Sequence, residues 1–63
     1  MKNKPTVKLI GENGNAFYIL GKVINALKKA GYDQAAIDEY KKEAKSGDYD
    51  HLLQTTMAWV DVE

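Results

Sequence analysis

The sequence predicts an α+β domain that is mostly helical, with a short N-terminal strand followed by three helices. Three observations indicate this class. The segment from Asn15 to Ala30 carries the longest helical pattern of apolar residues, two further helical patterns follow it, and a short β-branched segment precedes it. With 63 residues, the chain is sized for one small domain spanning residues 1–63, in which we expect residues 1–5 to be loose.

The strand is predicted at residues 6–10, because this segment is rich in β-branched and apolar residues that partly alternate with polar ones. Pro5 favours an extended backbone just before it. Val7 and Leu9 would face one side of the strand, and the other residues of the segment would face the opposite side. Gly11 ends the segment.

The loop at residues 11–15 allows two interpretations. In one, its Asn-Gly pair forms a two-residue hairpin turn between two apolar strands. In the other, Asn15 or Asn13 caps a helix that begins at Ala16. We favour the helix, because the helical periodicity continues unbroken to Ala30, which is longer than a strand needs.

The first helix presents a wide apolar face. Its apolar residues fall within an arc of roughly 160°, which suits contact with neighbours on two sides. Gly31 is typical of the residue that follows a helix C-terminus. Gly21 lies in the middle of the helix, where glycine costs up to about 1 kcal/mol relative to alanine. We expect a neighbouring backbone to approach closely at Gly21 and to offset this cost.

Two more helices follow. Asp33 is the expected cap of a helix over residues 34–45, whose narrow apolar arc predicts that it lies on the surface as a lid. Asp48 or Asp50 is the expected cap of the third helix, which continues to about Trp59.

The last residues, 60–63, also fit a short strand, which could pair with residues 6–10 and cover an open edge. The hydrophobic core is predicted from the inward-facing positions of all these elements. Its members are Leu9, Phe17, Leu20, Val23, Ile24, Leu27, Ile37, Tyr40, Leu53, Met57 and Val60.

Charge and composition narrow the function classes. Lysines and acidic residues balance at nine each, so the formal net charge is zero, whereas a dedicated nucleic-acid binder normally carries a basic surplus. The chain has no cysteine for a disulfide or a thiolate metal site. No apolar run approaches the roughly 20 residues that span a bilayer. We therefore expect a cytoplasmic protein without a membrane partner.

The sequence gives little support for an enzyme, a metal site or a cofactor. Asp48, Asp50 and His51 could bind metal or transfer protons, but aspartates at a helix start also serve as caps, and no second ligand cluster exists. The loop at residues 11–15 lacks a phosphate-binding motif. Ser46 is the chain's only serine, and a body this small can hardly enclose a substrate. We expect no catalytic residue and no small-molecule substrate.

The third helix carries the residues that best fit a protein partner, namely Trp59, Met57 and Tyr49. Aromatic residues and methionine are enriched where proteins meet, and a small domain cannot easily bury all its large side chains. The alternative is that Trp59 and Met57 fill the core. For the chain as a whole we expect an apolar and aromatic patch that docks on another protein or on a second copy.

A second hypothesis concerns the polar face of the first helix, where Tyr18, Lys22 and Lys29 form a stripe that could follow a phosphate backbone. The simpler interpretation is a solvated helix face. The chain has no arginine, the commonest reader of guanine edges, which argues against sequence-specific binding of nucleic acid.

Two segments, GENGNAFYILG near the start and SGDYDHLLQTTMAWVDVE at the end, resemble those of a group of short, uncharacterised bacterial proteins from phage-like or other mobile regions. The resemblance covers residues 10–62. It implies a stand-alone bacterial domain, but the group has no activity or ligand that would assign a function to any residue.

Overall fold

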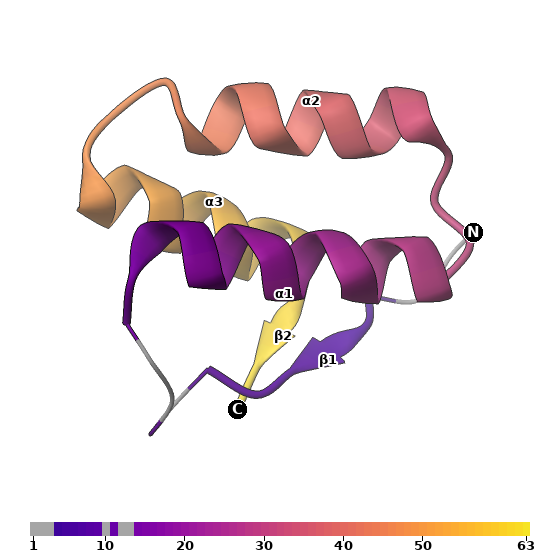
Figure 1. Cartoon of the computed structure of the whole chain (residues 1–63), viewed down its shortest axis with the longest axis horizontal. Coiled ribbons are helices and arrows are strands. Elements are labelled where there is room, and N and C mark those ends of the chain that lie inside the picture. The colour runs from indigo at the N-terminus through magenta and orange to yellow at the C-terminus, as the bar shows by residue number, and fades with distance from the viewer. Residues whose placement is uncertain (1–3, 10, 12–13) are drawn as a thin grey trace.

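The fold is that of a small, mostly helical α+β domain. The computed structural model of the chain describes residues 4–9, 11 and 14–63. Its elements in chain order are β1 (Thr6–Val7), α1 (Ala16–Lys29), α2 (Gln34–Ala44), α3 (Tyr49–Trp59) and β2 (Asp61–Val62) (Figure 1). The predicted class is therefore confirmed, and the strand that residues 60–63 could form is present as Asp61–Val62.

The two strands form a parallel sheet that joins the beginning and the end of the domain. The register pairs Thr6 with Asp61 and Val7 with Val62. Hydrogen bonds continue past the strand ends, from Leu9 N to the Glu63 carbonyl at 2.7 Å and from Asp61 N to the Pro5 carbonyl at 2.9 Å. Pro5 is thus part of the ladder, and the Lys4 ammonium donates to the Met57 carbonyl at 3.3 Å. Residues 1–3 lie outside the described part of the chain.

The alternation predicted for the first strand is present where the structure describes it. Val7 is buried and Leu9 is half-buried, whereas Thr6 and Lys8 are exposed. Ile10, the last residue of the predicted strand, lies outside the described residues. The sheet therefore contributes one apolar side to the core and presents Thr6 and Lys8 to water.

Each helix begins at a side-chain cap of the predicted type. The Asn15 side chain accepts a hydrogen bond from the Phe17 amide at 2.9 Å, so the helix interpretation of this region is confirmed over the hairpin. The carboxylates of Asp33 and Asp48 accept from backbone amides of α2 and α3 in the same way, each at 2.9 Å. Asn13, the other candidate cap of α1, lies outside the described residues. These caps satisfy amide groups that have no partner within the helix.

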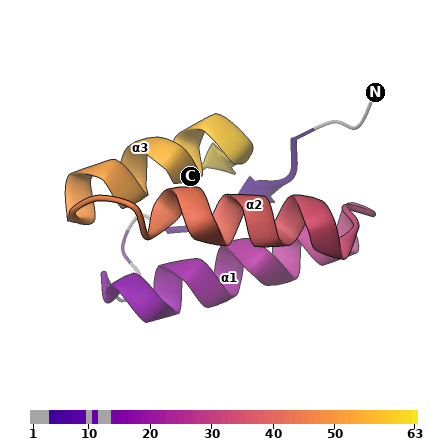
Figure 2. The same cartoon turned by 90° about the horizontal axis from the view of Figure 1, so that it is seen from above.

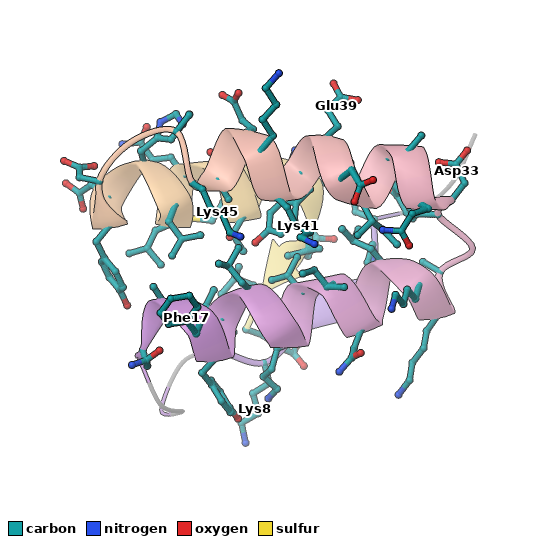
Figure 3. All side chains as sticks on the ribbon, turned by 45° about the horizontal axis from the view of Figure 1, so that its top comes forward. Lys8, Phe17, Asp33, Glu39, Lys41 and Lys45 are labelled. Carbon is teal, nitrogen blue, oxygen red and sulfur yellow. The ribbon has the colours of Figure 1, made fainter. Side chains whose placement is uncertain are left out.

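The helices stack in alternating directions around the core. α2 lies across α1 and α3 on one side of the molecule, and the small sheet lies on the other side (Figures 1 and 2). The outer side of α2 carries polar residues such as Glu39, which points away from α1 (Figure 3). Its inner side buries Ile37, Tyr40 and Ala44, so α2 is the predicted lid helix.

The core contains residues from every element except β2. Its buried apolar members are Val7, Ile19, Leu20, Val23, Leu27, Ile37, Tyr40, Ala44, Leu52 and Val60. Three of the predicted core residues, Leu9, Ile24 and Leu53, are only partly buried and pack against the edge of this cluster.

The core prediction is wrong for two residues, Phe17 and Met57. Phe17 is 78% exposed and Met57 is 54% exposed. Phe17 lies in the first turn of α1 at the edge of its apolar arc, so no neighbouring helix covers it. Met57 is exposed because α3 turns Leu52, Thr55 and Thr56 toward the core, which rotates Met57 outward.

The centre of the core is Tyr40, whose ring is fully buried. Its hydroxyl shares a 2.8 Å hydrogen bond with the hydroxyl of Thr56, which is also fully buried. Burial raises the pKa of the Tyr40 phenol above its ordinary value of 10.0, and the hydrogen bond with Thr56 lowers it by less. The bond joins α2 to α3 and satisfies both polar groups away from water.

The structure requires a glycine at Gly31 but not at Gly21. Gly31 follows α1 at a φ of 90°, in the left-handed region expected of the residue after a helix. The expectation of a close backbone approach at Gly21 is wrong, because a Cβ there would meet nothing within 4 Å beyond its own helix backbone. Gly21 lies on the exposed side of α1, so its helical cost is not offset by packing.

Gly21→Ala should therefore stabilise the protein. The substitution removes backbone freedom from the unfolded chain and meets no neighbour, so the free energy of unfolding should rise by about 0.5–1 kcal/mol in chemical denaturation. Gly31→Ala is the matched control and should destabilise the protein, because its φ disfavours a Cβ. A loss of stability in Gly21→Ala would indicate a close neighbour at this position.

The Tyr40–Thr56 bond should show coupling in a double-mutant cycle. Tyr40→Phe leaves the Thr56 hydroxyl buried without this partner, and Thr56→Val does the same to Tyr40, so each should cost about 1–3 kcal/mol in denaturant unfolding. The double variant removes both polar groups, and its loss should be clearly smaller than the sum of the two. Additive losses would mean that the bond contributes nothing of its own.

The raised pKa of Tyr40 also predicts a loss of stability in alkali. Below the unfolded pKa near 10, the phenol is protonated in both states and its contribution is complete. As the pH rises from there through the higher folded pKa, the unfolded chain loses the proton first, so the free energy of unfolding falls. Denaturation between pH 9 and pH 12 should show this fall in the wild type and a smaller one in Tyr40→Phe. Equal slopes would contradict the assignment.

Candidate docking surface

The candidate site is an apolar surface centred on Tyr49, the first residue of α3. A groove of about 400 Å³ lies on one side of this residue, between the start of α1 and the turn that joins α2 to α3. A second groove of about 340 Å³ lies on its other side, between α1, α3 and the sheet. Tyr49 lines both grooves and is 46% exposed.

Tyr49 is held in place at both of its ends. Asp48 caps α3, which fixes the backbone of Tyr49 in the first helical turn. Its hydroxyl donates a short hydrogen bond to the Gly14 carbonyl, in the segment that leads into α1. A Cβ at Gly14 would lie 3.4 Å from this hydroxyl, which is an ordinary contact distance. Since the ring is anchored at both ends, its conformational freedom is already reduced.

The groove between α3 and the sheet is lined almost entirely by apolar groups. Met57 forms its exposed side, and Leu9, Leu53 and Val62 are half-buried around it. No lysine or carboxylate of the described residues lines this groove. Its lining suits an aliphatic or aromatic side chain.

The groove beside the first turn of α1 has an apolar floor and a charged rim. Leu20, Ala44 and Leu52 form the floor, and Lys45 and Asp48 lie at the rim.

Phe17 projects beside this groove from the start of α1 (Figure 3). Because the side chain of Phe17 is apolar, the sequence pattern placed it in the core and did not predict its exposure. Its position at the edge of the α1 arc was the signal that could have revealed its exposure.

The three residues predicted to meet a partner do not lie together. Tyr49 and Met57 line the same groove, whereas Trp59 is half-buried on the side of α3 that faces α2. The Trp59 ring meets the Tyr40 ring edge-on, with centroids 5.8 Å apart and an interplanar angle of 65°. It also meets the Tyr32 ring at 6.2 Å. These contacts are typical of packing between helices.

The group around His51 is built into the turn between α2 and α3. The His51 Nε2 atom lies 3.0 Å from the Glu43 carbonyl and 3.1 Å from the Ser46 hydroxyl. The Ser46 hydroxyl donates to the same Glu43 carbonyl at 2.7 Å. A Cβ at Gly47 would come 2.8 Å from the His51 Cβ, so a larger residue there would displace the histidine. The histidine and the serine thus satisfy a carbonyl at the end of α2.

The residues around His51 do not form a metal site among the described residues. Of the two aspartates considered with His51, Asp48 is occupied as the cap of α3. Within the described ranges, no group of three or more histidine, aspartate or glutamate side chains could hold an ion.

The lysine stripe of α1 faces β1 across a third groove, of about 320 Å³. Lys22 and Lys29 line one side of it, and Lys8 of the β1 segment lines the other. The Lys22 ammonium donates to the Lys8 carbonyl at 3.0 Å and lies 5.5 Å from the centroid of the Tyr18 ring. Two of the three predicted residues of the stripe, Lys22 and Lys29, therefore share this groove with Lys8, which sequence reasoning did not include. Tyr18 does not line the groove and lies against the Lys22 ammonium.

Comparisons of the chain with protein-family models, with curated proteins and with solved structures find no match. The resemblance to short bacterial proteins of mobile regions stays a prediction. In the part of the chain that the structure describes, no helix combines the length and the apolar character that crossing a bilayer requires.

Proposed function

We propose that the protein is a non-enzymatic interaction module that docks a protein partner on the apolar surface formed by Phe17, Tyr49 and Met57, here called the Tyr49 surface. The observation that carries this proposal is the placement of these three exposed side chains on two apolar grooves that meet at Tyr49. A partner that presents two large apolar side chains, one for each groove, fits this arrangement.

The energetics support a modest affinity. Burying one large apolar side chain contributes about 1.5–3 kcal/mol, so two such side chains contribute about 3–6 kcal/mol. Covering Met57 and Phe17 adds to this gain, while the lost translational and rotational freedom subtracts from it. A contact of this size would be weak, with Lys45 and Asp48 at the rim to orient the partner.

Self-association is the nearest variant of the same proposal. The formal net charge is zero, so there is little long-range repulsion between copies of the chain. An exposed apolar surface on such a chain favours contact between copies as well as contact with another protein. Trp59 stays a predicted partner residue, but it lies outside the Tyr49 surface and its removal would also disturb the contacts with Tyr40.

Nucleic-acid binding by the lysine stripe is the second candidate. The observation in its favour is the groove in which Lys8, Lys22 and Lys29 meet. Against it, the Lys22 ammonium is already bonded to the Lys8 carbonyl, and so few cations neutralise few phosphates. We therefore place docking on the Tyr49 surface first.

The test is a substitution on α3 with a matched control. Peptides selected from a displayed library on the wild-type protein should contain two large apolar residues. Met57→Glu should weaken the binding of these peptides at least about tenfold, because it places a charge in an apolar groove. Ala58→Glu adds the same charge at the exposed neighbouring position outside the grooves, and should bind within about twofold of the wild type.

Sedimentation equilibrium of the same variants separates the possible partners. A second copy would be identified as the partner if the wild type formed a dimer that dissociates in Met57→Glu and persists in Ala58→Glu. If both variants bound the selected peptides as the wild type does, the Tyr49 surface would not be the docking site.

A further inference from the structure

The outer edge of β1 carries backbone groups that the sheet does not use. In the parallel ladder, the carbonyls of Pro5 and Val7 and the amide of Leu9 all bond to the β2 side. Because successive residues of a strand direct their backbone groups to opposite edges, the groups of Thr6 and Lys8 are directed away from β2. Both of these residues are exposed.

Within the described residues, one group of this outer edge has a hydrogen-bond partner. The Lys8 carbonyl accepts a hydrogen bond from the Lys22 ammonium at 3.0 Å. Among residues 4–9, 11 and 14–63, no hydrogen bond is made by the Thr6 amide, the Thr6 carbonyl or the Lys8 amide. These groups form a short template of the kind on which a further strand can pair.

The groove beside this edge is cationic. It lies between β1 and the second half of α1, and is lined by Thr6, Val7 and Lys8 on one side and by Lys22, Asn25 and Lys29 on the other. No carboxylate of the described residues lines it. Lys8 lies below α1, on the opposite side from α2 (Figure 3). A segment seated here would meet backbone partners on β1 and positive charge on both walls.

We propose that the outer edge of β1 takes a third strand from an extended acidic peptide segment of another protein. The Thr6 amide, the Thr6 carbonyl and the Lys8 amide would hydrogen-bond the segment, which is the mode of recognition known as strand addition. Lys8 and Lys29 would select carboxylates at alternate positions, since side chains of a strand repeat every second residue on one side.

The sheet already contains a strand of this chemistry. Asp61, Val62 and Glu63 follow α3 as an extended segment with acidic residues on either side of a valine, and this segment pairs with the inner edge of β1. A peptide that alternates acidic residues with valine would therefore give β1 similar neighbours on its two edges.

Charge also argues against the other occupants of this edge. Two copies meeting edge to edge through β1 would bring Lys8 of each copy together, and like charges across paired strands are destabilising. A nucleic acid would use the lysines but not the unpaired backbone groups of Thr6 and Lys8. The chain has no arginine to strengthen phosphate binding.

The experiment uses a fluorescein-labelled synthetic peptide of alternating glutamate and valine, titrated with the intact protein and followed by fluorescence anisotropy. A copy of the peptide with N-methyl groups on every backbone nitrogen keeps the side-chain charges but has no amide hydrogen on either edge with which to pair as a strand. The parent peptide should bind at least about tenfold more tightly than the N-methylated one. Hydrogen exchange of the Thr6 and Lys8 amides should slow when the parent peptide binds.

Charge selection is tested with two neighbouring lysines of α1. Lys29→Glu reverses a charge that lines the groove and should weaken peptide binding about fivefold or more. Lys28→Glu makes the same change on the adjacent exposed residue, which does not line the groove, and should bind within about twofold of the wild type. Met57→Glu should also leave this binding intact, so a failure of the Tyr49 surface is distinguishable from a failure of the β1 edge.

Several outcomes would overturn the proposal. Equal binding of the parent and N-methylated peptides would show attraction by charge without strand pairing. Tighter binding of a single-stranded DNA oligonucleotide than of the peptide, lost in Lys29→Glu, would assign the groove to nucleic acid. No slowing of exchange at Thr6 and Lys8 with the peptide bound would place the peptide elsewhere.

Discussion

The rest of the structure depends on the burial of the Tyr40 hydroxyl. A phenol that is fully buried needs a hydrogen-bond partner, and the Thr56 hydroxyl supplies it at 2.8 Å. Because Thr56 must face Tyr40, the rotation of α3 about its axis is set. Leu52 and Val60, one helical turn on either side, are buried on the same side, and Trp59 comes to lie against the Tyr40 ring. The same rotation leaves Met57 outside the core.

The domain consists of three short helices and two strands of two residues each. A chain this small cannot bury all of its apolar side chains. What remains uncovered is concentrated where the start of α1, the start of α3 and the sheet converge, with Tyr49 between two grooves. The hydroxyl of Tyr49 anchors this region to the Gly14 carbonyl, which fixes the orientation of the ring. For the proposed docking function, preorganisation of this kind would lower the entropic cost of binding.

The sheet has two roles in this arrangement. Its inner edges join the first and last described segments through a parallel ladder, which packs Val7 and Val60 into one core. Its outer edge at β1 faces the lysines of α1 across a polar groove. The molecule thus carries an apolar surface at one place and a cationic strand edge at another, and the two differ in the chemistry that they would accept. Substitutions at Met57 and Lys29 address them separately.

The sequence by itself determined the features that depend on local interactions. Asp33 caps α2, Gly31 follows α1, and apolar periodicity marks each helix, because all of these act within a few residues. For α1 and α3 the sequence left two candidate caps each, and the structure shows Asn15 and Asp48 in this role.

Only the tertiary structure decided which part of each apolar arc is covered. Phe17, Met57 and the open side of Gly21 were misjudged, because periodicity reports that a face is apolar and not how a neighbouring helix is rotated against it. The sequence also could not predict the grooves beside Tyr49 or the contact of Lys8 with the lysine stripe of α1. They join residues far apart in the chain, and their contacts arise only when the helices and the sheet close around Tyr40.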